Sequence, residues 1–214
     1  MRFIKMLGLA ATAALAAMAL VGASSASANS NTALCTVHTS LDCGPNVYTG
    51  HVEATAGVTK LKTAVATVEC QSSHILGNAL GLATAPAPLV GHLELVTFAN
   101  CETSLGVGCS VTTTALGLLL LLKIALNEGL VESHGTWVKV LCAGVLHCEY
   151  GGTFHVGTAL GSTLPLGASS LGLVHANATE VQRRKALDPD VCPAESKWTA
   201  LYTVQLPHNL FILR

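Results

Sequence analysis

The sequence predicts an all-β protein, a single antiparallel β-sandwich of about eight to ten strands with little helix, stapled by disulfides. Three observations predict it: apolar and polar residues alternate along several segments, Gly-containing turns separate most of these segments, and eight cysteines are spread over the chain. Half of the 214 residues are apolar, 11% are charged and 4% are aromatic. This composition excludes the disordered class, and a net charge of −1 gives no electrostatic basis for binding nucleic acid.

The first 28 residues are expected to be a signal peptide and not part of the fold. Two basic residues precede a largely apolar run over 6–21, and Ala-Ser-Ala at 26–28 supplies the small residues of a cleavage site. An uncleaved membrane anchor is the weaker alternative, because the run is shorter than the ~20 residues that cross a bilayer. We therefore expect Sec-type export with cleavage after Ala28. The mature chain at 29–214 is then one all-β domain without a transmembrane helix, located outside the cell or in the cell envelope.

An even number of cysteines in an exported chain predicts a framework of four disulfides. Short spacing favours three local bridges and leaves one long-range pair: Cys35–Cys43, Cys101–Cys109, Cys142–Cys148 and Cys70–Cys192. Each short loop contains a turn residue, which allows the close approach of Cα atoms that a disulfide needs. A zinc site is the alternative, but no spacing has the Cys-x2-Cys form of structural zinc modules.

Strands are predicted wherever period-two alternation or a concentration of Thr, Val, Tyr and Trp occurs. The predicted strands are Leu61–Cys70, Leu89–Phe98, Cys109–Thr114, Gly135–Cys142, Cys148–Val156, Leu171–Ala178 and Trp198–Val204. Helix signals are few, and the best candidates are Thr179–Leu187 and a short turn near His74–Leu82. Both are expected to be minor elements.

The run Ala115–Leu122 is uncharged and contains five consecutive leucines, Leu118 to Leu122. We expect a central strand covered on both faces, because short continuous apolar runs are typical of such strands. A helix is a second possibility, since Leu and Ala favour helices intrinsically. A third possibility is an apolar groove or a contact with lipid or a partner.

No catalytic, cofactor-binding or metal-binding motif is found, so no such residues and no cofactor are assigned. Nine histidines are scattered along the chain, and His134, His147 and His155 would cluster only if their strands were neighbours. Because their spacing matches no known ligand pattern, a metal site is not expected. The basic triplet at 183–185 is interpreted as a solvated loop.

Several short motifs carry a resemblance to a known group of proteins. They are Thr-Ala-Leu-Cys at 32–35, Leu-Val-Thr-Phe-Ala-Asn-Cys at 95–101, Cys-Ser-Val-Thr at 109–112, Cys-x5-Cys-Glu-Tyr at 142–150 and the closing segment at 191–204. Together with the signal peptide, they resemble a group of small, secreted, functionally unassigned, cysteine-containing all-β proteins of high-GC Gram-positive bacteria. The resemblance implies no catalytic residues.

Two classes of function follow from the sequence. The first is a non-enzymatic structural or binding module, secreted or in the cell envelope, whose partner is an envelope component or an apolar ligand. The absence of catalytic motifs favours it, and the Leu-rich strand could serve a lipid-binding version. The second is a secreted hydrolase whose His, Ser and acidic residues meet only in the folded chain.

Overall fold

The computed structural model describes residues 32–37, 43–80, 83, 87–144, 146–162, 172–186 and 192–213. The predicted signal peptide at 1–28 lies outside the described residues. Within them the all-β prediction is confirmed, because the described elements are twelve strands and one three-residue 3-10 helix, η1 (Gly44–Asn46). The strands of the main sheet are β2 (Gly50–Ala56), β3 (Thr59–Lys62), β4 (Thr67–Ala79), β5 (Leu89–Thr103), β6 (Gly108–Ala115), β7 (Leu118–Ala125), β8 (Glu128–Cys142), β9 (Leu146–Leu160), β10 (Leu173–Ala186) and β11 (Glu195–Leu206).

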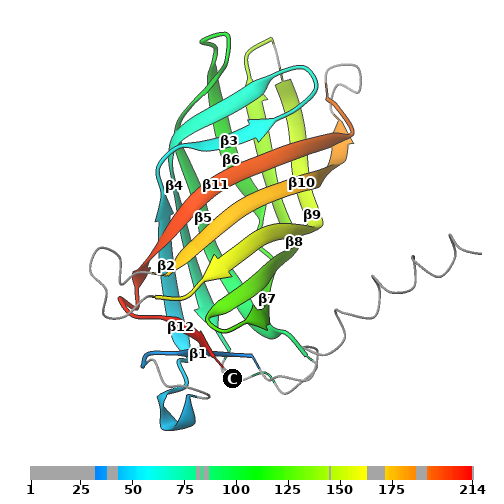
Figure 1. The fold of residues 1–214 in the computed structure, drawn as a ribbon. Helices are drawn as coiled ribbons and strands as arrows, with labels where there is room; N and C mark the ends of the chain where they lie inside the picture. The colour runs from blue at the N-terminus through cyan, green and yellow to red at the C-terminus, as the bar shows by residue number, and fades with distance from the viewer. Residues whose placement is uncertain are drawn as a thin grey trace, which may run out of the picture.

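The main sheet closes into a barrel, so the predicted sandwich is wrong (Figure 1). β2 and β3 lie end to end between β4 and β11, and β6 and β7 lie end to end between β5 and β8. The barrel therefore has eight strand positions, each antiparallel to the next along the chain, and β11 closes it against β2 and β3. Sandwiches and barrels bury one face of each strand alike. Alternation along single strands therefore could not reveal that the first and last strands pair.

A second, two-stranded sheet closes one end of the barrel, at the bottom of Figure 1. It pairs β1 (Ala33–Cys35) with β12 (Phe211–Leu213). Leu34 and Ile212 belong to the hydrophobic cluster inside the barrel, whereas Phe211 and Leu213 pack in a separate cluster with Cys35 and Cys43. This sheet is the floor of the barrel, with apolar side chains buried on both of its faces.

Asn127, between β7 and β8, ties the floor to the barrel wall. Its side-chain Oδ1 accepts a hydrogen bond from the backbone N–H of Ile212 at 2.9 Å, and its Nδ2 donates to the carbonyl oxygen of Ser162 at 2.9 Å. The backbone N–H of Asn127 also donates to the carbonyl oxygen of Ile212 at 3.0 Å. One side chain and its backbone therefore fix β12 across the barrel end.

All eight cysteines form disulfides, as predicted, but only the Cys35–Cys43 bridge has the predicted pairing. The predicted Cys101–Cys109, Cys142–Cys148 and Cys70–Cys192 pairs are wrong; the bridges are Cys70–Cys101, Cys109–Cys142 and Cys148–Cys192. The first two join directly opposed residues of neighbouring strands, with Cα–Cα distances of 3.9 and 4.3 Å. Cys101 also lies opposite Cys109 in the register of β5 and β6. Sequence spacing cannot choose between two such neighbours.

The leucine run forms strand β7, but the expectation that both of its faces are covered is wrong. Leu119 and Leu121 point into the barrel, while Leu118 and Leu120 are half-buried and Leu122 is exposed. In a barrel wall one face of each strand points outward, and none of the described elements forms a second layer over that face of β7. The helix alternative is wrong, and the leucines on one side of β7 line the interior of the barrel.

Three further expectations about elements need correction. The predicted strand Leu61–Cys70 is a hairpin, because β3 ends at Lys62 and the Thr63 hydroxyl donates to the carbonyl oxygen of Ala66 across a tight turn. Both helix candidates fall largely in strands: β10 extends to Ala186, and β4 extends to Ala79. Pairing with neighbouring strands outweighs the helix propensity of these short segments.

Candidate functional site

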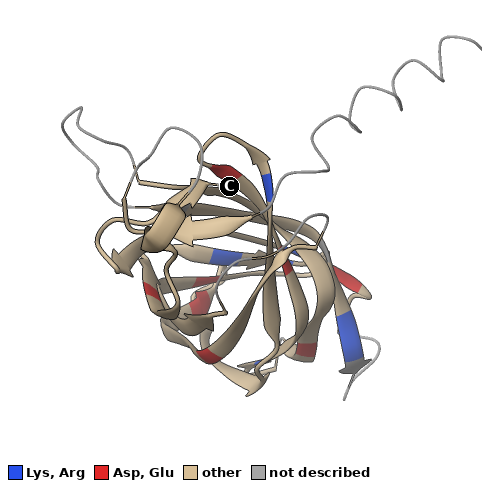
Figure 2. Ribbon diagram, turned by 90° about the horizontal axis from the view of Figure 1, so that it is seen from below, with Lys and Arg blue, Asp and Glu red and all other residues tan. Residues whose placement is uncertain are grey.

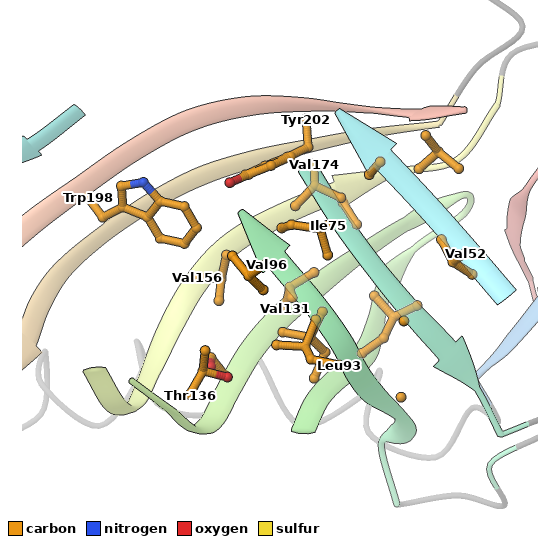
Figure 3. Close-up of a pocket in the computed structure, with 18 of the residues that line it drawn as sticks. Val52, Ile75, Leu93, Val96, Val131, Thr136, Val156, Val174, Trp198 and Tyr202 are labelled. Carbon is orange, nitrogen blue, oxygen red and sulfur yellow. The ribbon is translucent and has the colours of Figure 1, made fainter. Parts of the chain in front are cut away.

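The barrel encloses an apolar cavity of about 240 Å³ between the floor and the disulfide-bonded upper part of the barrel. Valine, leucine, isoleucine and alanine side chains from nearly all strand positions form its wall (Figure 3). Leu34, Leu210 and Ile212 close it at the floor. Interior side chains of a small eight-stranded barrel either fill the interior or leave room for one small ligand. This barrel leaves room.

Aromatic side chains are concentrated around the cavity. The whole chain has four Phe, two Trp and three Tyr. Five of these nine line the cavity: Phe98, Tyr150, Phe154, Trp198 and Tyr202. Trp198 packs edge-on against Phe98 and against Tyr202, with ring centroids 6.4 and 5.9 Å apart. A chain with few aromatic residues thus places most of them where they could contact a ligand.

One buried polar pair lies at the edge of this aromatic group. The hydroxyls of Tyr202 and Ser73 are 2.8 Å apart and hydrogen-bonded to each other, joining β11 to β4 across β2. Burial raises the pKa of Tyr202 well above its ordinary value, an effect that the hydrogen bond between Tyr202 and Ser73 opposes. Tyr202 therefore remains neutral at physiological pH and presents a neutral hydroxyl near the cavity (Figure 3).

Two more residues with hydroxyl groups, Ser133 and Thr136 on β8, line the cavity. The register of β8 against β9 shifts between His134 and Thr136, and Gly135 has a left-handed φ of 82°. This irregularity is a β-bulge, which changes the side of the sheet to which the following residues point. Both residues lie on the inner side of β8 for this reason, although they are three positions apart.

Two glycines make room for the bulge. A Cβ atom on Gly117, in the break between β6 and β7, would lie 2.0 Å from the carbonyl oxygen of His134. A Cβ atom on Gly151 of β9 would lie 2.0 Å from the carbonyl oxygen of Thr136. The bulge is thus held between two strands that approach it only because they lack side chains there.

The cavity and the outer surface differ sharply in charge. None of the described lining residues is Asp, Glu, Lys or Arg, and the one imidazole, that of His92, belongs to an exposed residue. The charged residues of the described strands are spread around the barrel (Figure 2). The cavity therefore offers no countercharge to an ionised ligand.

The wall is least regular between β5 and β6. β5 pairs with β6 at Cys101 and Glu102, and it pairs with β7 from Leu89 to His92. The two pairings have the same register. No ladder pairing occurs between the two paired stretches, where the Thr113 hydroxyl donates to the carbonyl oxygen of Val96 at 2.7 Å. Along this stretch β5 is therefore joined to the facing chain by few of the described hydrogen bonds, among them the one from the backbone N–H of Leu93 to the carbonyl oxygen of Gly117 at 3.0 Å.

The three histidines considered in the sequence are only partly brought together. His134 and His155 both contact the carboxylate of Glu132, at 3.2 and 3.0 Å, on the outside of the barrel. His147 lies near the other end of β9. In the described part of the chain, no group of three or more His, Cys, Asp or Glu side chains is placed to hold a metal ion.

The basic triplet at 183–185 is not in a loop as predicted, because it belongs to strand β10. The guanidinium of Arg184 lies over the ring of Trp137, 5.1 Å from its centroid, and 3.4 Å from the carboxylate of Glu149. Trp137 therefore lies on the outer wall, whereas Trp198 lies inside. None of the described helices is long and apolar enough to cross a membrane.

Sequence reasoning assigned no catalytic, cofactor-binding or metal-binding residues, and apart from the leucine run, considered as an apolar groove, it missed the cavity-lining residues. The apolar residues of each alternating strand did indicate which side chains are buried. Recognising them as the lining of one cavity required knowing that the strands surround a common space. Comparison with known proteins adds no assignment: the chain matches no family model, no curated protein and no solved structure.

Proposed function

We propose that the protein is an exported binding protein that holds one small, predominantly apolar molecule inside its barrel. The apolar cavity of about 240 Å³ carries this proposal. Eight-stranded antiparallel barrels with an open interior are well suited to hold one small ligand. An apolar cavity of about 150 Å³ in another protein stays dry and binds benzene, so this larger one suits a molecule of one or two rings or a short branched chain.

The composition of the wall supports binding more than catalysis. Ligand sites are typically lined by apolar and aromatic side chains with a few placed polar groups. A hydrolase of the Ser-His-carboxylate type would need a histidine, a nucleophile and a carboxylate in one pocket. In the described residues, four histidine rings contact glutamate carboxylates, and no serine hydroxyl hydrogen-bonds to them. The hydrolase alternative therefore has less support.

Fluorescence titration of the oxidised mature protein with 1-naphthylamine, a two-ring dye that is uncharged at neutral pH, tests the proposal. We expect saturable binding of one dye molecule, seen as enhanced and blue-shifted dye fluorescence. Trp198→Phe changes the cavity wall and should alter the affinity for the dye, whereas Trp137→Phe on the outer wall should leave it unchanged.

A matched pair of variants on β9 places the dye. Val156→Phe adds volume inside the cavity and should weaken binding, whereas Thr153→Phe adds the same ring at an exposed position and should not. Urea unfolding of both variants shows whether each is folded. Absence of saturable binding by the folded wild-type protein, or equal binding by both folded variants, would contradict the proposal.

A further inference from the structure

Ser133 and Thr136 have polar atoms without a partner among the described residues. The two residues are only 3% and 8% exposed, and no described residue hydrogen-bonds to Ser133 Oγ or Thr136 Oγ1. A buried hydroxyl without a partner lowers stability, and native proteins contain few of them. Both atoms belong to residues that line the apolar cavity.

Other buried hydroxyls of the barrel are satisfied. The Ser196 hydroxyl donates to the carbonyl oxygen of Val181, and the Thr63 hydroxyl donates to that of Ala66. The hydroxyls of Ser73 and Tyr202 are hydrogen-bonded to each other. The hydroxyls of Ser133 and Thr136 therefore differ from these hydrogen-bonded ones. Both belong to one strand, on either side of one bulge.

The bulge is what brings the two hydroxyls to the same side of β8. In an uninterrupted strand, side chains three positions apart point to opposite faces. The inserted residue at the bulge removes this difference, and the close approach of Gly117 and Gly151 to the bulge backbone makes room for it. Bulges often re-aim a side chain at a functional site.

The polar group that fits here is neutral. A serine or threonine hydroxyl can donate one hydrogen bond and accept others, so it can serve an alcohol, a ketone or an ester. An ionised carboxylate or amine would enter a space in which no described lining residue is Asp, Glu, Lys or Arg. Burying a charge without a countercharge is strongly unfavourable.

We infer that Ser133 and Thr136 form a hydrogen-bonding anchor for one neutral polar group, a hydroxyl or carbonyl, of an otherwise apolar ligand in the barrel. This inference rests on the proposed function and narrows its ligand class. The rest of the ligand is held by the aromatic and aliphatic wall, and the anchor fixes its orientation. An ionised amphiphile, such as a fatty-acid carboxylate, is excluded from the ligand class.

Three probes with the same ring body test the inference: naphthalene, 2-naphthol and 2-naphthoate. At neutral pH the first has no polar group, the second a neutral hydroxyl and the third a charge. Each probe competes against the two-ring dye 1-naphthylamine for wild type, for Ser133→Ala and for Thr136→Val. Thr153→Val on the outer face of β9 is the control. We expect 2-naphthoate to bind at least tenfold more weakly than 2-naphthol.

Each anchor substitution should weaken 2-naphthol binding by about two- to tenfold, the range of one net hydrogen bond, and should leave naphthalene binding unchanged or tighter. The unfolding midpoints of both variants should equal or exceed that of wild type, because each change removes an unpartnered hydroxyl. The control should change nothing.

The possible failures are distinguishable. If no probe displaces or replaces the dye, the proposed function itself fails. If naphthalene and 2-naphthol bind but the substitutions affect both equally or neither, the cavity binds ligands and the anchor is refuted. Binding of 2-naphthoate as tight as that of 2-naphthol would refute the neutral ligand class, and a lowered unfolding midpoint in Thr136→Val would show that its hydroxyl already has a structural role.

Discussion

Gly117 is the position where adding a single methyl group should be most informative. It lies in the break between β6 and β7, and Gly57 occupies the corresponding break between β2 and β3. A Cβ atom on Gly117 would lie 2.0 Å from the carbonyl oxygen of His134 and 2.7 Å from two further backbone atoms, whereas a Cβ atom on Gly57 would have nothing within 4 Å. Neither glycine has a left-handed φ, so backbone strain does not complicate the comparison.

Gly117→Ala should therefore destabilise the protein and Gly57→Ala should not. The atoms that Gly117→Ala would meet are backbone atoms of the β8 bulge, which cannot rotate away as a side chain can. Overpacking of this kind costs about 1–3 kcal/mol and occasionally more. Gly57→Ala should be neutral or stabilise by about 0.4–1 kcal/mol, because alanine restricts the unfolded chain at a position without a clash.

Urea unfolding of the oxidised mature protein measures both free energies. The midpoint should fall in Gly117→Ala and stay or rise in Gly57→Ala, with similar denaturant dependence in both. Because the clash displaces the bulge, Gly117→Ala should also weaken 2-naphthol binding more than naphthalene binding. Equal midpoints for the two variants would refute the assignment of Gly117 as a close-approach glycine and, with it, the role of this strand break in positioning the bulge.

Two other predictions concern covalent and ionic stability. Replacing both cysteines of the Cys148–Cys192 bridge with serine should lower the free energy of unfolding by about 4 kcal/mol on the chain-entropy model, and the same change at Cys35–Cys43 by about 2.5 kcal/mol, because the sequence separations are 44 and 8. The unfolding midpoints of the two variants test this order, and peptide mapping without reduction checks the pairing. Burial raises the pKa of Tyr202 in the folded state above that in the unfolded state. Above about pH 10, the ordinary tyrosine pKa, the side chain therefore ionises in the unfolded state but not in the folded one, and the free energy of unfolding falls as the pH rises further. The unfolding midpoint should fall above that pH, and less steeply in Tyr202→Phe.

The sequence predicted strands well where alternation was clear and failed where a property of the whole sheet decided the outcome. The segments Cys109–Thr114 and Trp198–Val204 fall within β6 and β11. By contrast, closure depends on β11 meeting β2 and β3, residues far apart in the chain. The disulfide pairing failed for the same reason, since the register that opposes Cys70 to Cys101 is set by the pairing of two long strands and not by cysteine spacing.

The leucine run shows the same limit at the scale of one strand. Its apolar composition was taken to mean burial on both faces, as in a layered sheet. In a barrel only the inward leucines, Leu119 and Leu121, line the interior, while Leu122 remains exposed. Leu120→Asp is accordingly a surface substitution at a half-buried position, and Leu121→Asp is the variant that would place a carboxylate in the apolar cavity.

The anchor hydroxyls could not have been predicted, because their placement depends on a break in the pattern used to read strands. Within the predicted strand Gly135–Cys142, the inward side chains are those of Thr136, Val138 and Val140, in regular alternation. The true strand begins earlier, at Glu128. In its first part the inward residues, such as Val131 and Ser133, have odd numbers, whereas after the bulge the inward residues have even numbers. Each part is consistent alone, and only the bulge between them makes the two compatible. A glycine in a strand indicates such a bulge in general, but its effect on parity can be read only after both halves have been assigned to one strand.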